Sequence, residues 1–167
     1  LVVSALADDG IKHNGDWAWR ILQHQGPQWW SNSYVIHLME QALWSSNDQY
    51  RHRSFGLLAM RFLRTDSVYQ PNDRMLQLAF EKLREGDWSC YRQNPGSPWP
   101  YFQVLDNSWD RIRGRLIEGL YAGPQRARSS CALLVARQFR RSHAAELDPN
   151  LLPLLDVICP LLFSELK

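Results

Sequence analysis

The chain has 167 residues, 45% of them hydrophobic, and a formal net charge of +2 at pH 7. An apolar fraction of this size is typical of a globular domain and argues against disorder, while a charge near zero gives no strong field for nucleic acid. The sequence contains no run of about 18 apolar residues and no basic leader followed by an apolar stretch. We therefore expect neither a membrane partner nor a signal peptide.

Three cysteines are spread along the chain, at Cys90, Cys131 and Cys159. Their number is odd and no two of them form a CxxC pair, which is typical of reduced, mostly buried thiols in a reducing compartment. We therefore expect an intracellular protein, cytoplasmic or nuclear. Because the chain begins at Leu1 without a methionine and has an apolar run at residues 161–163, we also expect it to be a piece of a longer protein.

Apolar residues recur at helical spacing along most of the chain, as in the run that begins at Val35, Leu38 and Met39. No stretch alternates with period two and β-branched residues, so no strands are predicted. The expected helices, in chain order, cover residues 16–25, 33–44, 47–64, 72–85 and 108–123, followed by a helix that Pro124 opens and a last helix over about 148–166.

Capping residues and prolines mark the ends of these helices. Ser33, Asn47, Asn72 and Ser108 are predicted N-caps, because the side-chain oxygens of Ser and Asn accept hydrogen bonds from the first amides of a helix. Pro160 lies deep in the last helix and is expected to kink or break it, since proline removes one backbone hydrogen bond.

One long irregular segment, residues 86–100, interrupts this pattern and contains three prolines and two glycines. Loops of this length are uncommon in compact domains and are often functional. Its Trp88, Tyr91, Arg92 and Trp99 belong to the residue types that dominate binding energy at interfaces. We expect this loop either to dock a partner or to fold its indole rings back into a gap between helix pairs.

The sequence repeats weakly at an offset of 62 residues, between the windows 42–58 and 104–120. The identical pairs are Leu43 and Leu105, Asp48 and Asp110, Arg51 and Arg113, Arg53 and Arg115, and Leu58 and Leu120. In both windows a short turn with Asn and Asp leads into an Arg-x-Arg helix, so we expect the two helices to be structurally equivalent.

The second window resembles the HEAT-repeat pattern, in which an apolar helix ends in a polar Asp/Asn turn. The next helix then opens with an apolar residue followed by Arg, as at Ile112-Arg113 and at Tyr50-Arg51. The resemblance implies an all-α fold of stacked antiparallel helix pairs, a HEAT- or armadillo-like right-handed solenoid. It also implies that the turn acid caps the second helix, and that the Arg bonds to acids or carbonyls in the neighbouring repeat. A non-repetitive helical bundle is the alternative.

We therefore expect residues 1–167 to form a single helical-repeat segment. Its helix pairs would span about 33–64, about 72–122 with the inserted loop, and about 124–166, while residues 1–25 would remain from a preceding pair. The last helix carries apolar residues on more than one face. We expect its outer face to meet a further element of the parent chain or a partner.

The sequence offers little for catalysis. Its five histidines are scattered without metal-binding spacing, no phosphate-binding glycine loop or nucleophile motif is present, and no histidine accompanies Cys90. We predict no catalytic residue, no cofactor, no metal site and no small-molecule ligand. Trp109-Asp110 and Asp87-Trp88 look faintly like the Trp and Asp of the HEAT-like alkylpurine DNA glycosylases, which leaves a DNA glycosylase as a remote alternative.

The balance of residue types favours an interaction protein. Sixteen Arg and three Lys make up the 19 basic residues, and the chain has 8 Trp. Arg and Trp are enriched at protein interfaces. We predict a non-enzymatic scaffold segment of a larger helical-repeat protein, with protein partners in a multi-subunit complex. The partner-binding candidates are Trp88, Tyr91, Arg92 and Trp99 in the loop, and Trp44.

The alternative is a segment that contacts RNA or DNA phosphate, such as a scaffold subunit of an RNA-modifying complex. Stacked helix pairs would align arginines into a basic strip. The candidates for this strip are Arg51, Arg53, Arg113, Arg115, Arg126 and Arg128. Acidic neighbours such as Asp48 and Asp110 allow a structural ladder of ion pairs instead, and we favour the ladder.

Overall fold

The computed structural model describes residue 29 and residues 31–64, 67–85, 99–141 and 149–163. Seven α-helices and one 3-10 helix make up the regular structure of these residues, which confirms the all-α prediction for them. They are α3 (Ser33–Ala42), α4 (Asp48–Phe62), α5 (Asp73–Glu85), α6 (Trp99–Asp106), α7 (Trp109–Tyr121), α8 (Gln125–Arg141), the 3-10 helix η2 (Pro149–Leu154) and α9 (Leu155–Phe163). Among the described helices, none has the length and apolar character needed to cross a membrane.

The chain divides into two compact units, unit 1 (Leu1–Met75) and unit 2 (Leu76–Lys167), and the boundary falls inside α5. The predicted helix over 16–25 and the predicted remnant over 1–25 lie outside the described residues.

In unit 1, α3 and α4 pack against each other, and an asparagine caps each of them. Asn47 Oδ1 accepts hydrogen bonds from the backbone amides of Gln49 and Tyr50, at 3.0 and 3.3 Å, as predicted. The cap of α3 differs from the prediction, because Asn32 takes it and Ser33 is the first helical residue. Asn32 Oδ1 reaches two amides of the first turn, at 3.1 and 3.3 Å, and so satisfies two donors at once.

The core of unit 1 consists of fully buried side chains on the facing sides of the two helices. Met39 and Leu43 come from α3 and its C-cap, and Phe55 and Leu58 come from α4. Ser54 is buried among them, and its hydroxyl donates a hydrogen bond to the Met39 carbonyl oxygen. This bond removes the cost of burying an unpaired hydroxyl, so the serine fits an otherwise apolar contact.

The start of α5 agrees with the sequence, because Asn72 Oδ1 accepts a hydrogen bond from the Met75 amide at 2.9 Å. Within unit 2, α5 buries Leu76, Ala79 and Leu83, which follow each other at the i, i+3 and i+7 spacing of one helical face.

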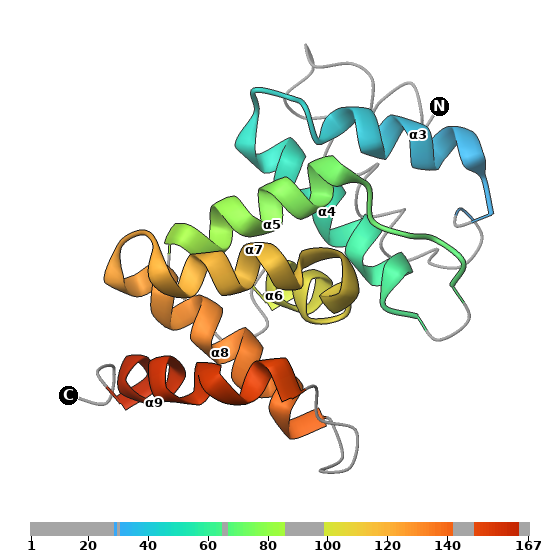
Figure 1. Ribbon diagram of the computed structural model, residues 1–167. Coiled ribbons are helices and arrows are strands. Elements are labelled where there is room, and N and C mark those ends of the chain that lie inside the picture. Colours follow the sequence, from blue (N-terminus) through green and yellow to red (C-terminus); the bar gives the residue numbers. More distant parts are fainter. Residues whose placement is uncertain (1–28, 30, 65–66, 86–98, 142–148, 164–167) are drawn as a thin grey trace. The chain divides into compact units, whose positions relative to one another are not determined.

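In unit 2, α8 packs against α6, α7 and α9, and Figure 1 shows it lying between α7 and α9. α7 contributes Ile112, Leu116 and Leu120 to the core, at the i, i+4 and i+8 spacing that keeps them on one face. α8 contributes Leu134 and Val135, which are also buried. The hydrophobic periodicity of the sequence therefore placed the core face of α7 correctly.

Two helix starts in unit 2 differ from the sequence prediction. α6 begins at Trp99, so the irregular segment expected to extend to Pro100 ends earlier. Pro100 is tolerated as the second residue of α6, because the first amides of a helix have no intrahelical acceptor. Ser108 stands at the N-cap of α7, but its side chain makes no capping hydrogen bond. Its ψ of 23° departs from the extended backbone that lets a cap side chain reach the first turn.

Gly123 and Pro124 connect α7 to α8. Gly123 has a φ of +102°, in the region that favours glycine over residues with a Cβ. The Pro124 carbonyl accepts a hydrogen bond from the Arg128 amide at 3.1 Å, and α8 begins at the next residue. Pro124 is thus the N-cap residue of α8, one position before the first turn in which the sequence placed it.

The C-terminal segment opens with η2 and continues as α9, rather than forming one continuous α-helix. Pro160 was expected to kink or break the last helix, and a break is wrong because α9 runs through it to Phe163, while a kink stays a prediction. Proline removes one backbone hydrogen bond there, while Ile158 and Leu161 on either side of it are buried in unit 2. The outer side of the segment includes exposed Leu155 and Phe163, so apolar residues lie on more than one face, as predicted. That a further element of the parent chain or a partner covers this side stays a prediction.

The two windows of the sequence repeat share the order of a helix end, a turn and a helix start. Leu43 and Leu105 are fully buried at equivalent positions, and so are Leu58 and Leu120. The turns differ, since residues 43–47 separate α3 from α4, whereas only residues 107 and 108 separate α6 from α7. The equivalence of α4 and α7 as members of a HEAT-like repeat therefore stays a prediction.

Candidate functional site

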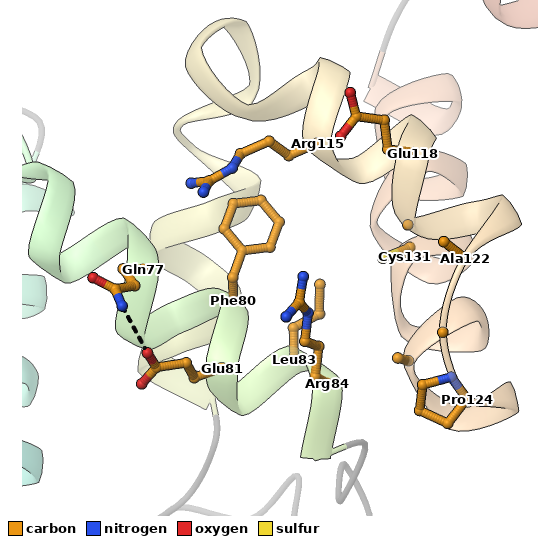
Figure 2. A pocket seen from close by; sticks show the side chains of 13 residues that line it. Gln77, Phe80, Glu81, Leu83, Arg84, Arg115, Glu118, Ala122, Pro124 and Cys131 are labelled. Carbon is orange, nitrogen blue, oxygen red and sulfur yellow. Dashed lines mark hydrogen bonds between the residues drawn. The ribbon is translucent and has the colours of Figure 1, made fainter.

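A groove in unit 2 lies between α5, α7 and α8 and encloses a volume of about 600 Å³ (Figure 2). Its floor is formed by Phe80, Leu83, Gly119, Ala127 and Cys131. Its charged and polar rim is formed by Gln77, Glu81, Arg84, Arg115 and Glu118, and Ala122, Gly123 and Pro124 also line it, where α7 ends and α8 begins. We call this feature the α5–α7–α8 groove.

The floor of the groove is apolar because α5 and α8 contribute buried residues to it and α7 contributes a glycine. Leu83 of α5 is 1% exposed, and Ala127 and Cys131 of α8 are each 4% exposed. Gly119 of α7 is needed for this packing, since a Cβ atom at that position would lie 2.6 Å from Cys131 Sγ. Gly119 of α7 and Ala127 of α8 are small, so they leave space above the floor that larger side chains would fill.

The thiol on the groove floor is unsuited to nucleophilic chemistry. Burial raises the pKa of Cys131 to about 11, and the nearby Arg84 guanidinium offsets only part of this rise. A thiol with so high a pKa is protonated near neutral pH, and the thiolate is the reactive form. Cys131 therefore acts as a small apolar residue of the floor.

The rim carries two guanidinium groups that flank one aromatic ring. The Arg115 guanidinium carbon lies 5.2 Å from the centroid of the Phe80 ring. In Figure 2 the ring of Phe80 lies between the guanidinium groups of Arg115 and Arg84. A cation over an aromatic face is attracted to the ring quadrupole, so Phe80 holds Arg115 in this orientation.

The acidic residues nearest to these arginines face other partners or other directions. Glu81 accepts a hydrogen bond from Gln77 Nε2 at 3.0 Å. Glu85 forms an ion pair with Lys82 at 2.6 Å. Glu118 points away from the Phe80 ring in Figure 2.

Within the described part of the chain, neither Arg84 nor Arg115 forms an ion pair with a carboxylate. The rim therefore presents two guanidinium groups that remain available to an anion.

A second polar cluster in unit 2 joins α6 to α8. Its carboxylate is buried, and its guanidinium is partly exposed. The carboxylate of Asp106 is 1% exposed and pairs with Arg137 at 3.2 Å. Gln138 Nε2 donates to both the side-chain Oδ1 and the backbone carbonyl of Asp106, at 3.0 and 2.9 Å. Arg137 also lies over the Phe102 ring, 5.1 Å from its centroid. The ion pair compensates the buried charge within the fold, so we assign the cluster a structural role.

Of the five predicted partner-binding residues, the structure describes two, Trp99 and Trp44. Trp88, Tyr91 and Arg92 lie outside the described residues, and Trp99 is the first residue of α6. Trp44 of unit 1 is 67% exposed, and the Arg74 guanidinium carbon lies 4.6 Å from its ring centroid. Trp44 is thus an exposed aromatic residue, as its candidacy requires, and its part in binding stays a prediction.

Among the predicted phosphate contacts, three have clear structural surroundings. Arg51 pairs with Asp48 and donates to the Ser45 carbonyl oxygen, within its own turn and helix rather than across a repeat. Arg128 Nε donates to the Leu120 carbonyl oxygen at 2.8 Å. Arg115 lines the α5–α7–α8 groove.

The other three predicted phosphate contacts lie on separate helices. Arg53 is half-buried on α4, Arg113 is exposed on α7, and Arg126 is exposed in the first turn of α8. Arg53 and Arg113 each take part in at least one further interaction, so the basic strip contains several residues with structural contacts.

Sequence reasoning did not single out Phe80, Arg84 or Cys131 as members of a site. Phe80 and Arg84 lie four residues apart on α5, a spacing that places them on one helical face and was visible in the sequence. Nothing in the sequence pairs that face with Arg115 of α7. Only the packing of the three helices brings the groove together.

In the described part of the chain, no three His, Cys, Asp or Glu side chains gather in a way that could hold a metal ion. The residues of the faint glycosylase resemblance, Trp109 and Asp110, begin α7 and do not line the groove. Comparison of the chain with protein-family models, with curated proteins and with solved structures finds no match.

Proposed function

We propose that this chain is a protein-interaction segment of a larger helical-repeat scaffold, and that it docks a partner protein in the α5–α7–α8 groove. The observation that carries the proposal is the groove itself, which combines an apolar floor with two guanidinium groups that no carboxylate of the described residues pairs with. Protein interfaces have this anatomy, with an apolar centre, a polar rim and Arg among the residues that contribute most to binding.

The charges of the rim support a protein partner over nucleic acid. Arg84 and Arg115 share the rim with Glu81 and Glu118, so its formal charges cancel. A nucleic-acid strand presents a series of phosphates and is held by surfaces with a strong excess of positive charge. Arg51 and Arg128 of the predicted basic strip are also engaged by groups of the fold. RNA or DNA binding is the alternative that the experiment must separate.

The proposal is tested by selecting peptides from a phage-displayed random library on the immobilised full-length chain. Affinities of the selected peptides are then measured by fluorescence polarisation. A labelled single-stranded RNA and a labelled DNA duplex are titrated in parallel over a series of salt concentrations. We expect peptides with micromolar affinity and only weak nucleic-acid binding. Nucleic-acid binding that is tighter and falls steeply with salt would support the alternative instead.

A groove-filling variant locates the peptide site. Ala122 is exposed and lines the groove just after α7, and its extended backbone accommodates a large residue. Ala122→Trp should abolish peptide binding because the indole occupies the groove. Gln49→Trp, which adds the same side chain at an exposed position of unit 1, is the matched control and should bind normally. Equal binding by the two variants would contradict docking in the groove.

A further inference from the structure

We infer that the α5–α7–α8 groove recognises an acidic side chain next to a large apolar side chain in its partner protein. The carboxylate would bind Arg84 and Arg115 on either side of Phe80, and the apolar side chain would lie on the groove floor. The inference rests on the proposed function and specifies the partner sequence that the groove selects.

The first support is the state of the two guanidinium groups. An Arg that is already paired with a carboxylate gives little to a ligand, because the two acids compete for the same donors. Arg84 and Arg115 form no such pair within the described residues, and the nearby Glu81 and Glu85 are held by Gln77 and Lys82. The two guanidinium groups therefore lie on either side of the Phe80 ring (Figure 2), and no carboxylate of the described residues pairs with either.

The second support is the orientation of Arg115. A long side chain on a surface normally loses conformational entropy when a ligand fixes it. The Phe80 ring, 5.2 Å from the guanidinium carbon, already restricts Arg115 in the absence of a ligand. Arg115 therefore loses less conformational entropy when a ligand binds it, which favours a specific contact over a diffuse electrostatic one.

The third support is the balance of charge, which selects a single carboxylate over a polyanion. Glu81 and Glu118 occupy the same rim, so a second negative group of a ligand would meet like charge. A single carboxylate between the two arginines avoids both acids, since Figure 2 shows Glu81 turned toward Gln77 and Glu118 turned away from the ring. An Asp or Glu side chain of a protein supplies such an isolated charge.

The fourth support is the shape and chemistry of the floor next to the arginines. Leu83, Ala127 and the protonated Cys131 offer apolar contact, and Gly119 adds no side chain above them. The side chains of Ala127 and Cys131 are small, and the floor does not fill the space of about 600 Å³. A Leu, Met or Phe of the partner, adjacent to the acidic residue, would bury its side chain there.

The test begins with the peptides that the full-length chain selects from the random library. We expect an Asp or Glu beside a Leu, Met or Phe to be enriched among them. Replacing that acid by its amide should weaken binding roughly tenfold or more, and Arg84→Gln and Arg115→Gln should each do the same. Arg126→Gln, at an exposed Arg of α8 that lies outside the groove lining, is the control and should leave affinity unchanged.

A charge-reversal experiment guards against variants that weaken binding only by misfolding. Arg115→Glu should lose the acidic peptide and gain a peptide in which Arg replaces the acid, because the ion pair is restored with reversed signs. Recovery of binding in this swapped pair supports the inference, and failure to recover it overturns the inference.

The remaining outcomes separate the inference from the proposed function. Selected peptides that lack an acid but are blocked by Ala122→Trp would overturn the inference and leave groove docking intact. Acidic peptides that bind Arg84→Gln and Arg115→Gln at full strength would also overturn it. Failure to select any peptide, together with tight RNA binding that Arg115→Gln weakens, would overturn both.

Discussion

The surface around Trp44 in unit 1 and the α5–α7–α8 groove in unit 2 are both built from an Arg and an aromatic ring. Arg74 lies over the Trp44 ring, and Arg115 lies over the Phe80 ring. The difference lies in what else each guanidinium contacts. Arg74 Nε also donates to the Leu43 carbonyl oxygen at 3.2 Å, so it fastens the start of α5 to the end of α3 within unit 1.

The groove shows the opposite arrangement. Arg115 is oriented by Phe80 but meets no carboxylate within the described residues, and the floor beside it is apolar. Arg137 of unit 2 resembles Arg74, because it lies over Phe102 and is held by Asp106. An Arg–aromatic pair is therefore not by itself evidence of a binding site. The remaining partners of the guanidinium decide whether it serves the fold or a ligand.

The largest expected effect tests whether the groove floor is as closed as its packing indicates. Cys131 is buried with a pKa raised to about 11, whereas Cys159 of α9 is exposed. Near neutral pH, iodoacetamide should modify Cys159 on the order of a hundredfold faster than Cys131, because Cys131 is buried and its raised pKa leaves it protonated. Mass mapping of the modified peptides measures the two rates separately.

Unfolding in urea provides the control for that comparison, since both thiols should then react at similar rates. Comparable rates in the native chain would mean that the floor opens readily. Such a result would contradict the description of the groove as a closed apolar floor beneath an open rim.

The next effect tests an Arg that we assign to the fold. Asp106→Asn removes the buried charge that holds Arg137 and should lower the free energy of unfolding by about 2 kcal/mol. Urea denaturation followed by circular dichroism measures the change.

Asp110→Asn is the matched control, because Asp110 is exposed in the first turn of α7. It should cost no more than about 0.5 kcal/mol, from the loss of a favourable helix-terminus charge. Two equal losses would show that the Asp106 cluster contributes less than its burial indicates.

A smaller effect tests the close approach of α7 to α8 under the groove. Gly119→Ala should destabilise the chain by about 1 kcal/mol, because the added Cβ lies 2.6 Å from Cys131 Sγ and forces the thiol to move. The sign should reverse when Cys131 is first changed to Ala. Gly119→Ala should then stabilise by about 0.5 kcal/mol, since Ala has the better helix propensity. Thermal melts of the four chains give the coupling, and independent effects of the two substitutions would contradict the contact.

The smallest expected effect addresses the comparison of the two arginines directly. Arg74→Gln loses a hydrogen bond and a ring contact and should cost about 1 kcal/mol of stability. Arg115→Gln loses only the ring contact and should cost about 0.5 kcal/mol. Affinity for the selected peptide should respond in the opposite order, with a loss for Arg115→Gln alone. A larger stability loss for Arg115→Gln would assign that residue to the fold.

The sequence was a good guide to local structure. Asn47 and Asn72 cap helices as predicted, and the periodic apolar residues of α4, α5 and α7 are the buried ones. These features depend on neighbours in the chain, because capping and helical periodicity involve residues within one or two turns. It was a poorer guide at Ser33, where the neighbouring Asn32 takes the cap, and at Ser108, whose side chain makes no capping hydrogen bond. It also did not predict that α9 continues through Pro160.

The sequence alone determined the helical class, most helix boundaries and which faces are apolar, since all three follow from spacing along the chain. It did not determine that α5, α7 and α8 meet at one groove, because helix faces far apart in sequence are paired by packing and not by local pattern. The same limit applies to the arginines. Arg51, Arg115 and Arg128 look alike in the sequence, and only the tertiary structure ties the first and third to groups of the fold and leaves the second facing a groove.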